Sequence, residues 1–376
     1  MVGPIIYSVA AVLSGTTSQA FMFTDRLQDE PNSEAPKIQP NLSRANIFDW
    51  KFDVLHLEET EKRPLVWLGM RIFAAFDTCK HLKIDEHILK NWLGLIEDHY
   101  HADNPYHNAT HAADVLHATA YYLNTSALES VLDPLEKIAC LIAAVIHDTD
   151  HPGRSSSFLI NSNDPLALLY NDRAILESHH SALAFRITLK DSTVNIFQNL
   201  DKTIYRQMRE SIVDMVLATD MTQHKVHVNN FTNALEQVGE GETFPQECIE
   251  YLKRMLIKCA DVSNPARPVR MAVQWAQRIT EEFFRQTDEE VARNLPVTLP
   301  MYNRNTCSFP ASQIGFYRFF INDLYSIWHE FTDLPELMRI YNSNFDFWKD
   351  LESKQIRSPQ EVQDYLTNNP FDPNED

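Results

Sequence analysis

The sequence is organised around the stretch IACLIAAVIHDTDHPG, which occupies residues 138–153. Its apolar first part, Ile138 to Ile146, predicts a buried helix. The two imidazoles and two carboxylates of HDTDH, residues 147–151, follow at once, and Pro152-Gly153 then breaks the helix. Burying so many ionisable groups without partners would cost several kcal/mol, so we expect metal ions to neutralise them.

Composition favours helices throughout the chain. Hydrophobic residues make up 44% of the 376 residues, which is typical of a globular protein. The 8 glycines against 19 prolines argue against a strand-rich sandwich or barrel, because such folds need many turns with positive φ. No long alternating strand pattern competes with the helical periodicity. We therefore predict an all-α fold with a compact, multi-helix, single catalytic domain.

The periodic segments give the predicted helices and the limits of the domain. They are 65–76, 88–96, 108–123, 134–146, 166–170, 174–185, 205–218, 245–260, 269–286, 312–331 and 334–349. We expect Asp133 to cap the helix that leads to HDTDH, with Pro134 at its first position. The catalytic domain is predicted to span residues 47–352, preceded by an arm or linker at 1–46 and followed by an acidic, solvated tail at 353–376.

Charge and cysteine content limit the partners and the compartment. The chain carries 33 basic and 52 acidic residues, a net charge of −19, which disfavours non-specific attraction to nucleic acid or anionic lipid. The five cysteines are odd in number and form no C-x-x-C pair, which indicates a reducing, cytoplasmic location. The apolar run from Ile5 to Leu13 lacks a basic flank and is interrupted by Ser8, so we predict neither a signal peptide nor a membrane span.

The ligands for a metal come from three separate segments. His107 and His111 are four residues apart at the start of a predicted helix, which places both imidazoles on one face. Such a pair alone is weak evidence for a metal site. Further candidate ligands strengthen it: His147-Asp148, and Asp261, which follows another amphipathic helix. Imidazole and carboxylate are the ligands of open catalytic zinc sites.

A second metal would complete a hydrolytic centre. Asp148 is the natural bridging ligand, and the other cation would be held mostly by water, as magnesium prefers. Two such cations would activate a shared water and hold phosphate oxygens, so the pattern predicts phosphoester hydrolysis. We expect His151 and Glu177 to hold metal-bound waters, although either could instead be an ordinary solvated side chain. Asp150 is predicted to cap the turn before Pro152.

Six motifs then resemble one known family. They are YHNATHAADV at 106–115, HDTDHPG at 147–153, LESHH at 176–180, ATDM at 218–221, CADVSNP at 259–265 and QIGF at 313–316. In this order, over residues 47–352, they resemble the class I cyclic-nucleotide phosphodiesterase catalytic domain. The segments ND at 171–172, QTDEE at 286–290 and NRNTCS at 303–308 look closest to phosphodiesterase family eight, the high-affinity cAMP-specific branch.

The resemblance implies a role for each matched residue. The zinc ligands it implies are His111, His147, Asp148 and Asp261, with Asp148 also bridging to Mg²⁺ or Mn²⁺. It makes His107 the general acid that protonates the ribose O3′. It places His151, Glu177 and Thr219 around the metal-bound waters. The substrate-binding residues it implies are Tyr106, Asn264, Ile279, Gln313 and Phe316, of which Gln313 reads the purine, Asn264 favours adenine, and Ile279 and Phe316 clamp the base.

The predicted activity is therefore hydrolysis of the 3′-phosphoester bond of 3′,5′-cyclic AMP to 5′-AMP, by a metal-bridging hydroxide with a histidine general acid. Hydrolysis of cGMP, or of both nucleotides, is the first alternative. Another alternative is a related metal hydrolase that acts on nucleotides with free phosphate groups. Such an enzyme usually needs more basic residues near its motifs than the scattered Arg154, Arg173 and Arg267. A catalytically dead cAMP-binding scaffold fits poorly, because every implied metal position is filled. The resemblance also raises a homodimer as the assembly.

Overall fold

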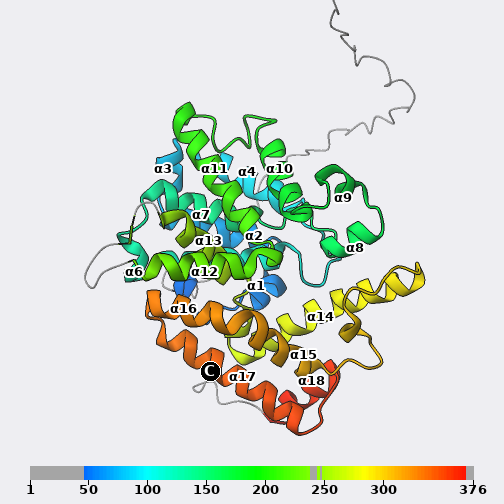
Figure 1. The fold of residues 1–376 in the computed structure, drawn as a ribbon. Helices are drawn as coiled ribbons and strands as arrows, with labels where there is room; N and C mark the ends of the chain where they lie inside the picture. The colour runs from blue at the N-terminus through cyan, green and yellow to red at the C-terminus, as the bar shows by residue number, and fades with distance from the viewer. Residues whose placement is uncertain (1–45, 238–243, 246–247, 370–376) are drawn as a thin grey trace, which may run out of the picture. The chain divides into compact units, whose positions relative to one another are not determined.

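Helices form all the regular structure in the part of the chain that the computed structural model describes, residues 46–237, 244–245 and 248–369 (Figure 1). The prediction of an all-α fold is thus confirmed. The arm predicted at 1–46, with its apolar run Ile5 to Leu13, falls almost wholly outside the described residues, as does the end of the chain from 370. Within the described ranges, no helix is long and apolar enough to cross a bilayer.

The elements follow one another without long interruptions. The α-helices are α1 (Val54–Thr60), α2 (Pro64–Ala75), α3 (Thr78–Leu82), α4 (Glu86–Glu97), α5 (Ala109–Leu123), α6 (Ser126–Glu129), α7 (Pro134–Ile146), α8 (Ser156–Asn161), α9 (Pro165–Tyr170), α10 (Ile175–Thr188), α11 (Lys202–Ala218), α12 (His224–Leu235), α13 (Ile249–Asp261), α14 (Val269–Ala292), α15 (Phe309–Phe316), α16 (Asn322–Thr332), α17 (Pro335–Ser353) and α18 (Pro359–Asn368). Short helical turns are η1 (Asn46–Phe48), η2 (Met221–Gln223), η4 (Asn264–Ala266), η5 (Pro300–Tyr302) and η6 (Tyr317–Ile321).

Helix α7 is the central element, as the apolar run predicted. Every residue from Ile138 to Ile146 is buried. The side chain of Asp133 accepts hydrogen bonds from the first turn, and the Glu136 carboxylate accepts one from the Asp133 backbone N–H, so a complete capping box fixes where the helix begins. Helices α5, α11 and α13 pack against α7. The residue that follows this buried helix, His147, is therefore delivered into the interior.

The predicted helix at 312–331 is helical throughout but changes type within its length. Helix α15 ends at Phe316, the π-helical segment η6 spans Tyr317–Ile321, and α16 continues from Asn322. A π-helical turn widens the helix locally and shifts the register of the side chains that follow. Over five residues its period cannot be told from that of an α-helix by counting apolar positions, which is why the sequence pattern missed it.

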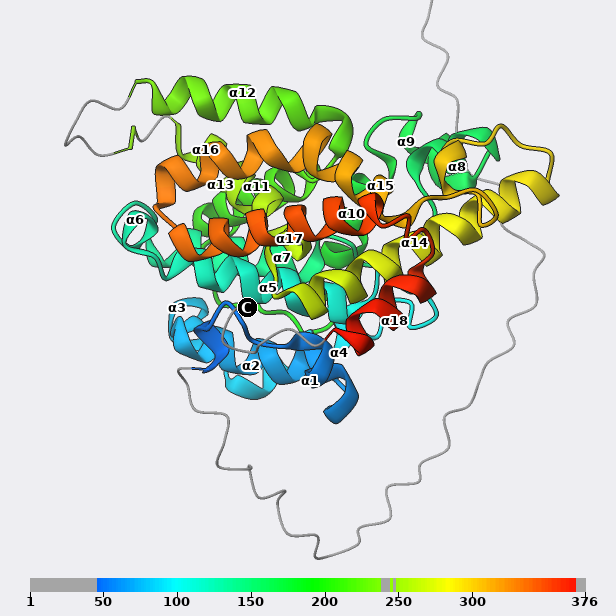
Figure 2. The ribbon, with the colours of Figure 1, turned by 90° about the horizontal axis from the view of Figure 1, so that it is seen from below.

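The tail predicted as solvated contains an ordered helix, α18. Ser358 and Glu361 form a capping box, and Val362 and Leu366 on the inner face are 0% and 3% exposed. Figure 2 shows α18 beside α14. The other residues of Pro359–Asn368 are exposed or half-buried, so this part of the predicted solvated tail is a helix that docks through two apolar residues at helical spacing.

A buried ion pair joins distant parts of the sequence. The Arg267 guanidinium lies 2.6 Å from the Asp114 carboxylate, and both side chains are fully buried. Arg267 also donates to the carbonyl of Trp50 at 3.0 Å and lies over its ring at 4.1 Å. The Trp50 indole in turn donates to the carbonyl of Ala266 at 2.7 Å. The residues before α1 are thereby attached to η4.

Replacing Arg267 by methionine should destabilise the fold strongly. Arg267→Met leaves Asp114 buried without its cation, so we expect the free energy of unfolding to fall by about 3–5 kcal/mol in urea denaturation. Lys349→Met, which removes an exposed pair with Asp346, is the control and should change the free energy of unfolding by less than about 1 kcal/mol. Equal effects of the two substitutions would contradict a special role for the buried pair.

Candidate active site

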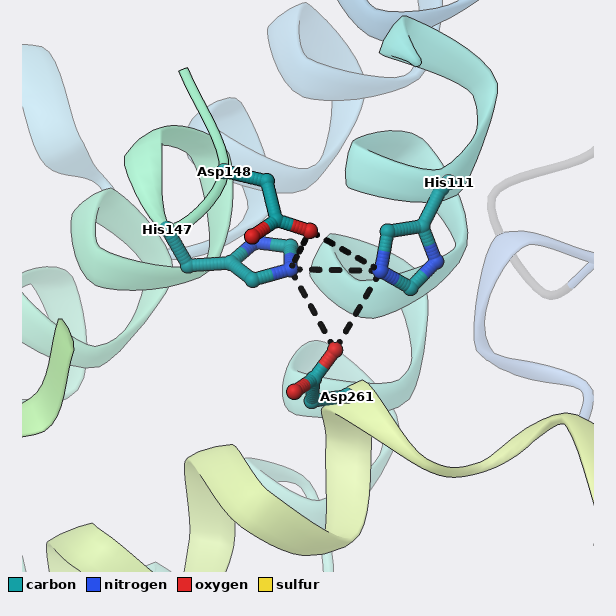
Figure 3. A group of neighbouring side chains, drawn as sticks. All are labelled: His111, His147, Asp148 and Asp261. Carbon is teal, nitrogen blue, oxygen red and sulfur yellow. Dashed lines mark hydrogen bonds and ion pairs between the residues drawn. The ribbon is translucent and has the colours of Figure 1, made fainter. Parts of the chain in front are cut away.

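The four predicted metal ligands converge on one point (Figure 3). His111 lies in the first turn of α5, where Asn108 caps the helix by accepting from the backbone N–H groups of Thr110 and His111. His147 and Asp148 directly follow α7, and Asp261 is the last residue of α13. Three helices that pack together thus place four side chains around a common centre.

The distances within this group fit a small cation. His111 Nε2 lies 3.2 Å from His147 Nε2, 3.2 Å from Asp261 Oδ1 and 3.5 Å from Asp148 Oδ2. His147 Nε2 lies 3.1 Å from Asp148 Oδ2 and 3.3 Å from Asp261 Oδ1. Four ligands held about 2.0–2.1 Å from a central zinc-like ion would be about 3.3–3.4 Å apart in a tetrahedron. The spacing therefore matches four ligands that share one cation.

The hydrogen bond of His147 favours the same interpretation. Its Nδ1 lies 2.9 Å from the carbonyl of Ala144, so in the neutral ring the proton is on Nδ1 and the lone pair of Nε2 faces the group. Burial tends to raise the pKa of Asp148, but the neighbouring His147 and His111 outweigh it and hold that pKa well below its usual range. A buried centre lined by carboxylate oxygens and an imidazole lone pair is suited to a divalent cation.

A second group of ligand atoms adjoins the first through Asp148. The donor atoms of Asp148, His151 and His180 all lie within 4.8 Å of one another. His180 Nδ1 lies 2.7 Å from the carbonyl of Thr149, which directs Nε2 toward Asp148 Oδ1, 3.6 Å away. Asp148, at the predicted bridging position, thus has two further imidazoles on its far side. Sequence reasoning did not identify His180.

Two other residues predicted to lie around the metal-bound waters are Glu177 and Thr219. Burial, together with the charges of Asp220, Asp148 and Asp261, raises the pKa of Glu177 to about 7. The Thr219 hydroxyl donates to the carbonyl of Val216 at 2.8 Å, so toward other groups it can only accept.

His107 has a partner that the sequence analysis missed. Its Nδ1 is hydrogen-bonded to Glu282 Oε1, while Glu282 Oε2 accepts from the backbone N–H groups of Tyr106 and His107, both at 3.1 Å. Burial alone would lower the pKa of His107, but the Glu282 carboxylate raises it to about 9. Burial likewise opposes ionisation of Glu282, yet His107 lowers its pKa to about 2. A charged pair is the result, in which Nδ1 of His107 faces Glu282 and Nε2 carries the other proton.

His151 packs flat against this pair. Its ring stacks on His107 with centroids 3.9 Å apart, and its Nδ1 accepts from the backbone N–H of Gly153 at 3.0 Å. Asn104 donates to the carbonyls of both His107 and His151, at 2.9 and 2.8 Å. Gly153 has φ +66°, and a Cβ there would come within 2.5 Å of the Asn104 oxygen, so only glycine fits. Asn104 is a second positioning residue that no motif indicated.

Asp150 does not cap a turn, contrary to prediction. It adopts the left-handed conformation, and its carboxylate bonds to His101 and His179 at 2.6 and 2.7 Å. Ser155 is the residue that caps the next helix, α8. Asp150 instead connects α10 to the loop before α5.

The predicted substrate-binding residues lie on several elements. Tyr106 packs on His111 with ring centroids 4.5 Å apart, and its hydroxyl donates to Asn264 Oδ1. Asn264 Nδ2 donates to Asp114 Oδ2 at 2.8 Å, which fixes the orientation of the amide. Gln313 is buried on α15, and within the described part of the chain its side-chain amide makes a single hydrogen bond, of 3.4 Å, to the Ser312 hydroxyl. Half-buried Ile279 on α14 and Phe316 on α15 pack against the main core.

Two histidines and two aspartates that could hold a cation, with a carboxylate-paired histidine beside them, form the kind of site found in metal-dependent hydrolases. Within that class, the family described as 3′5′-cyclic nucleotide phosphodiesterase matches residues 106–343. The chain belongs to this family.

Curated relatives and a solved structure agree with this assignment. A human protein named "High affinity cAMP-specific and IBMX-insensitive 3′,5′-cyclic phosphodiesterase 8A" is 50% identical over 341 residues, which cover 85% of this chain and 41% of that protein. A Drosophila melanogaster protein, "High affinity cAMP-specific and IBMX-insensitive 3′,5′-cyclic phosphodiesterase 8", is 47% identical over 319 residues, covering 83% of this chain and 35% of its own length. The chain therefore spans less than half the length of these two relatives.

The phosphodiesterase domain of the RhoPDE fusion protein from Salpingoeca rosetta has the same fold. It superposes with a TM-score of 0.76 at 32% identity, covering 82% of this chain and 96% of that one.

The charged pair should make stability depend on pH. Because the pKa of His107 is raised from about 6.5 to about 9, the pair contributes its full stabilisation below about 6.5 and loses it as the pH rises through about 9. We expect the free energy of unfolding of the metal-free protein to fall over this window, and Glu282→Gln to reduce the fall. Urea denaturation between pH 6 and 10 measures this, and parallel curves for the two proteins would argue against the pair.

Proposed function

We propose that this chain hydrolyses the 3′-phosphoester bond of 3′,5′-cyclic AMP to give 5′-AMP. The observation that carries the proposal is the group of His111, His147, Asp148 and Asp261, with the His107–Glu282 pair beside it. The names of the human and Drosophila relatives, both described as cAMP-specific phosphodiesterases, support the choice of substrate.

We assign a zinc ion to the four-ligand group and a magnesium or manganese ion to the neighbouring position beyond Asp148. Two imidazoles and two carboxylates suit zinc. When bound, such a pair of cations would polarise the phosphate and lower the pKa of a water molecule. Glu177, His151 and Thr219 are the side chains that would hold water around the second cation, Thr219 as an acceptor.

His107 supplies the proton in the proposed reaction. Water adds its oxygen to phosphorus and gives up one proton, the bond from phosphorus to O3′ breaks, and the proton on His107 Nε2 passes to O3′. The proton that the water gave up returns His107 to its charged form. Glu282 keeps the imidazole protonated at neutral pH and holds it in one orientation through Nδ1. His151, stacked against the same ring, limits its rotation.

Asn264 is the residue that we propose selects adenine. Tyr106 and Asp114 hold its amide in one orientation, so it cannot rotate to exchange donor and acceptor. The remaining lone pair of its oxygen would accept from the 6-amino group of adenine, whereas the 6-oxo group of guanine has no proton to give. Gln313 has no comparable anchor, so its amide can suit either base. Hydrolysis of both nucleotides is therefore the alternative.

A two-nucleotide assay tests substrate and metal together. We expect cAMP turnover to exceed cGMP turnover at equal low concentration, and EDTA to abolish both, with recovery on adding Zn²⁺ and Mg²⁺. Equal rates would overturn the selectivity, and turnover that survives metal removal, checked by elemental analysis, would overturn the metal-dependent mechanism.

Substitutions at His107 and Glu282 test the proton donor. His107→Ala should retain both metals but lose about 10²–10⁴-fold in kcat, the usual contribution of general acid catalysis. In the native protein kcat should decline as the pH rises through about 9, and Glu282→Gln should move this decline to lower pH. His56→Ala, at an exposed histidine, is the control. Loss of bound metal in His107→Ala would instead make His107 a ligand.

A further inference from the structure

The last described segment of the chain contacts the two helices that carry the proposed base clamp. Phe309, the first residue of α15, donates its backbone N–H to the carbonyl of Arg357 at 2.7 Å. Gln277 on α14 donates its side-chain amide to the carbonyl of Pro359 at 3.2 Å. Arg357 and Pro359 are two residues apart, so one short piece of backbone connects the start of α15 to the middle of α14.

This connection lies close in sequence to the proposed clamp on both sides. Gln277 is two residues before Ile279, and Phe309 is four residues before Gln313. Among the described residues, α14 and α15 both pack against α17, and both bond to the Arg357–Pro359 segment. The spacing of the two helices therefore depends on what packs across them. Figure 2 shows α18 next to α14.

The connecting segment is itself held rigidly. The Glu361 carboxylate accepts from the backbone N–H groups of Arg357 and Ser358, at 2.8 and 2.9 Å, and the Ser358 hydroxyl accepts from the N–H of Glu361 at 3.2 Å. Buried Val362 and Leu366 anchor the rest of α18 in the core. The start of α15 has one further attachment, to α17: the hydroxyl of Ser308 donates to the Glu352 carboxylate at 2.8 Å.

We infer that Arg357–Pro359, held in place by α18, is a positioning element that sets the distance between α14 and α15 and hence the width of the purine pocket. Gln277 is the side chain through which it acts on α14. The inference rests on the proposed function only in naming the purine as the occupant. The Arg357–Pro359 segment would thereby affect the affinity for the substrate but not the chemical step.

Two substitutions separate this role from general stability. Gln277→Leu removes the donor to Pro359 while keeping similar bulk, and Ser358→Ala removes half of the capping box. Gln360→Ala is the matched control, because Gln360 is exposed on the same helix and bonds only to Asp364. For each variant we would measure hydrogen exchange of the Phe309 amide, KM and kcat for cAMP, metal content and the thermal midpoint.

We expect Gln277→Leu and Ser358→Ala to speed exchange at Phe309 and to raise KM, each by about two- to tenfold, as for the loss of one net hydrogen bond. Metal content and kcat should stay unchanged, and Gln360→Ala should behave as the native protein. Unchanged exchange at Phe309, or a KM that does not move with it, overturns the inference. Failure of the native protein to hydrolyse cAMP would overturn the proposed function, while the exchange measurement would still decide whether the segment holds α15.

Discussion

The structure depends on a group of electron-rich atoms brought together in the interior. Two imidazoles and two carboxylates meet where α5, α7 and α13 approach one another, with spacings of 3.1–3.5 Å. Such atoms repel unless a positive charge lies among them, so the packing of three apolar helices and the affinity for a cation are coupled. Apolar burial brings the groups close, and a bound cation would in turn stabilise the packing of the helices.

The histidines around this group show how the fold fixes the direction of each ring. In four of them, His107, His147, His151 and His180, one nitrogen is hydrogen-bonded to a neighbour, which determines what the other nitrogen can do. His147 and His180 bond through Nδ1 to backbone carbonyls and present a lone pair, whereas His151 accepts at Nδ1 from a backbone N–H and so carries its proton on Nε2. His107 differs from the other three because its Nδ1 is bonded to a carboxylate, that of Glu282, which raises the pKa of the imidazole. His107 also lies outside the four-ligand group.

Sequence patterns predicted the parts that repeat or that cluster locally. The helical periodicity along the chain predicts a helical protein. The metal site is predicted from the His107/His111 pair only in combination with His147-Asp148 and Asp261. Glu282 and Asn104 were missed because a charged or amide residue on a helix or loop is usually solvated, and only the three-dimensional packing buries them against His107. The π-helical segment at Tyr317–Ile321 is too short for its period to be recognised in the sequence. The docking of α18 was missed because it depends on the contact of Val362 and Leu366 with the core.

The contact between Trp50 and the Ala266–Arg267 turn has a consequence for how the protein is made. The indole of Trp50 and its acceptor are 216 residues apart in the sequence. At a synthesis rate of about 5–20 residues per second, the delay between the synthesis of Trp50 and that of Arg267 is about 10–40 s. The packing of the first helices remains incomplete during this time. The N-terminal edge of the domain is therefore exposed longest, and we expect chaperones that bind nascent chains to contact it first.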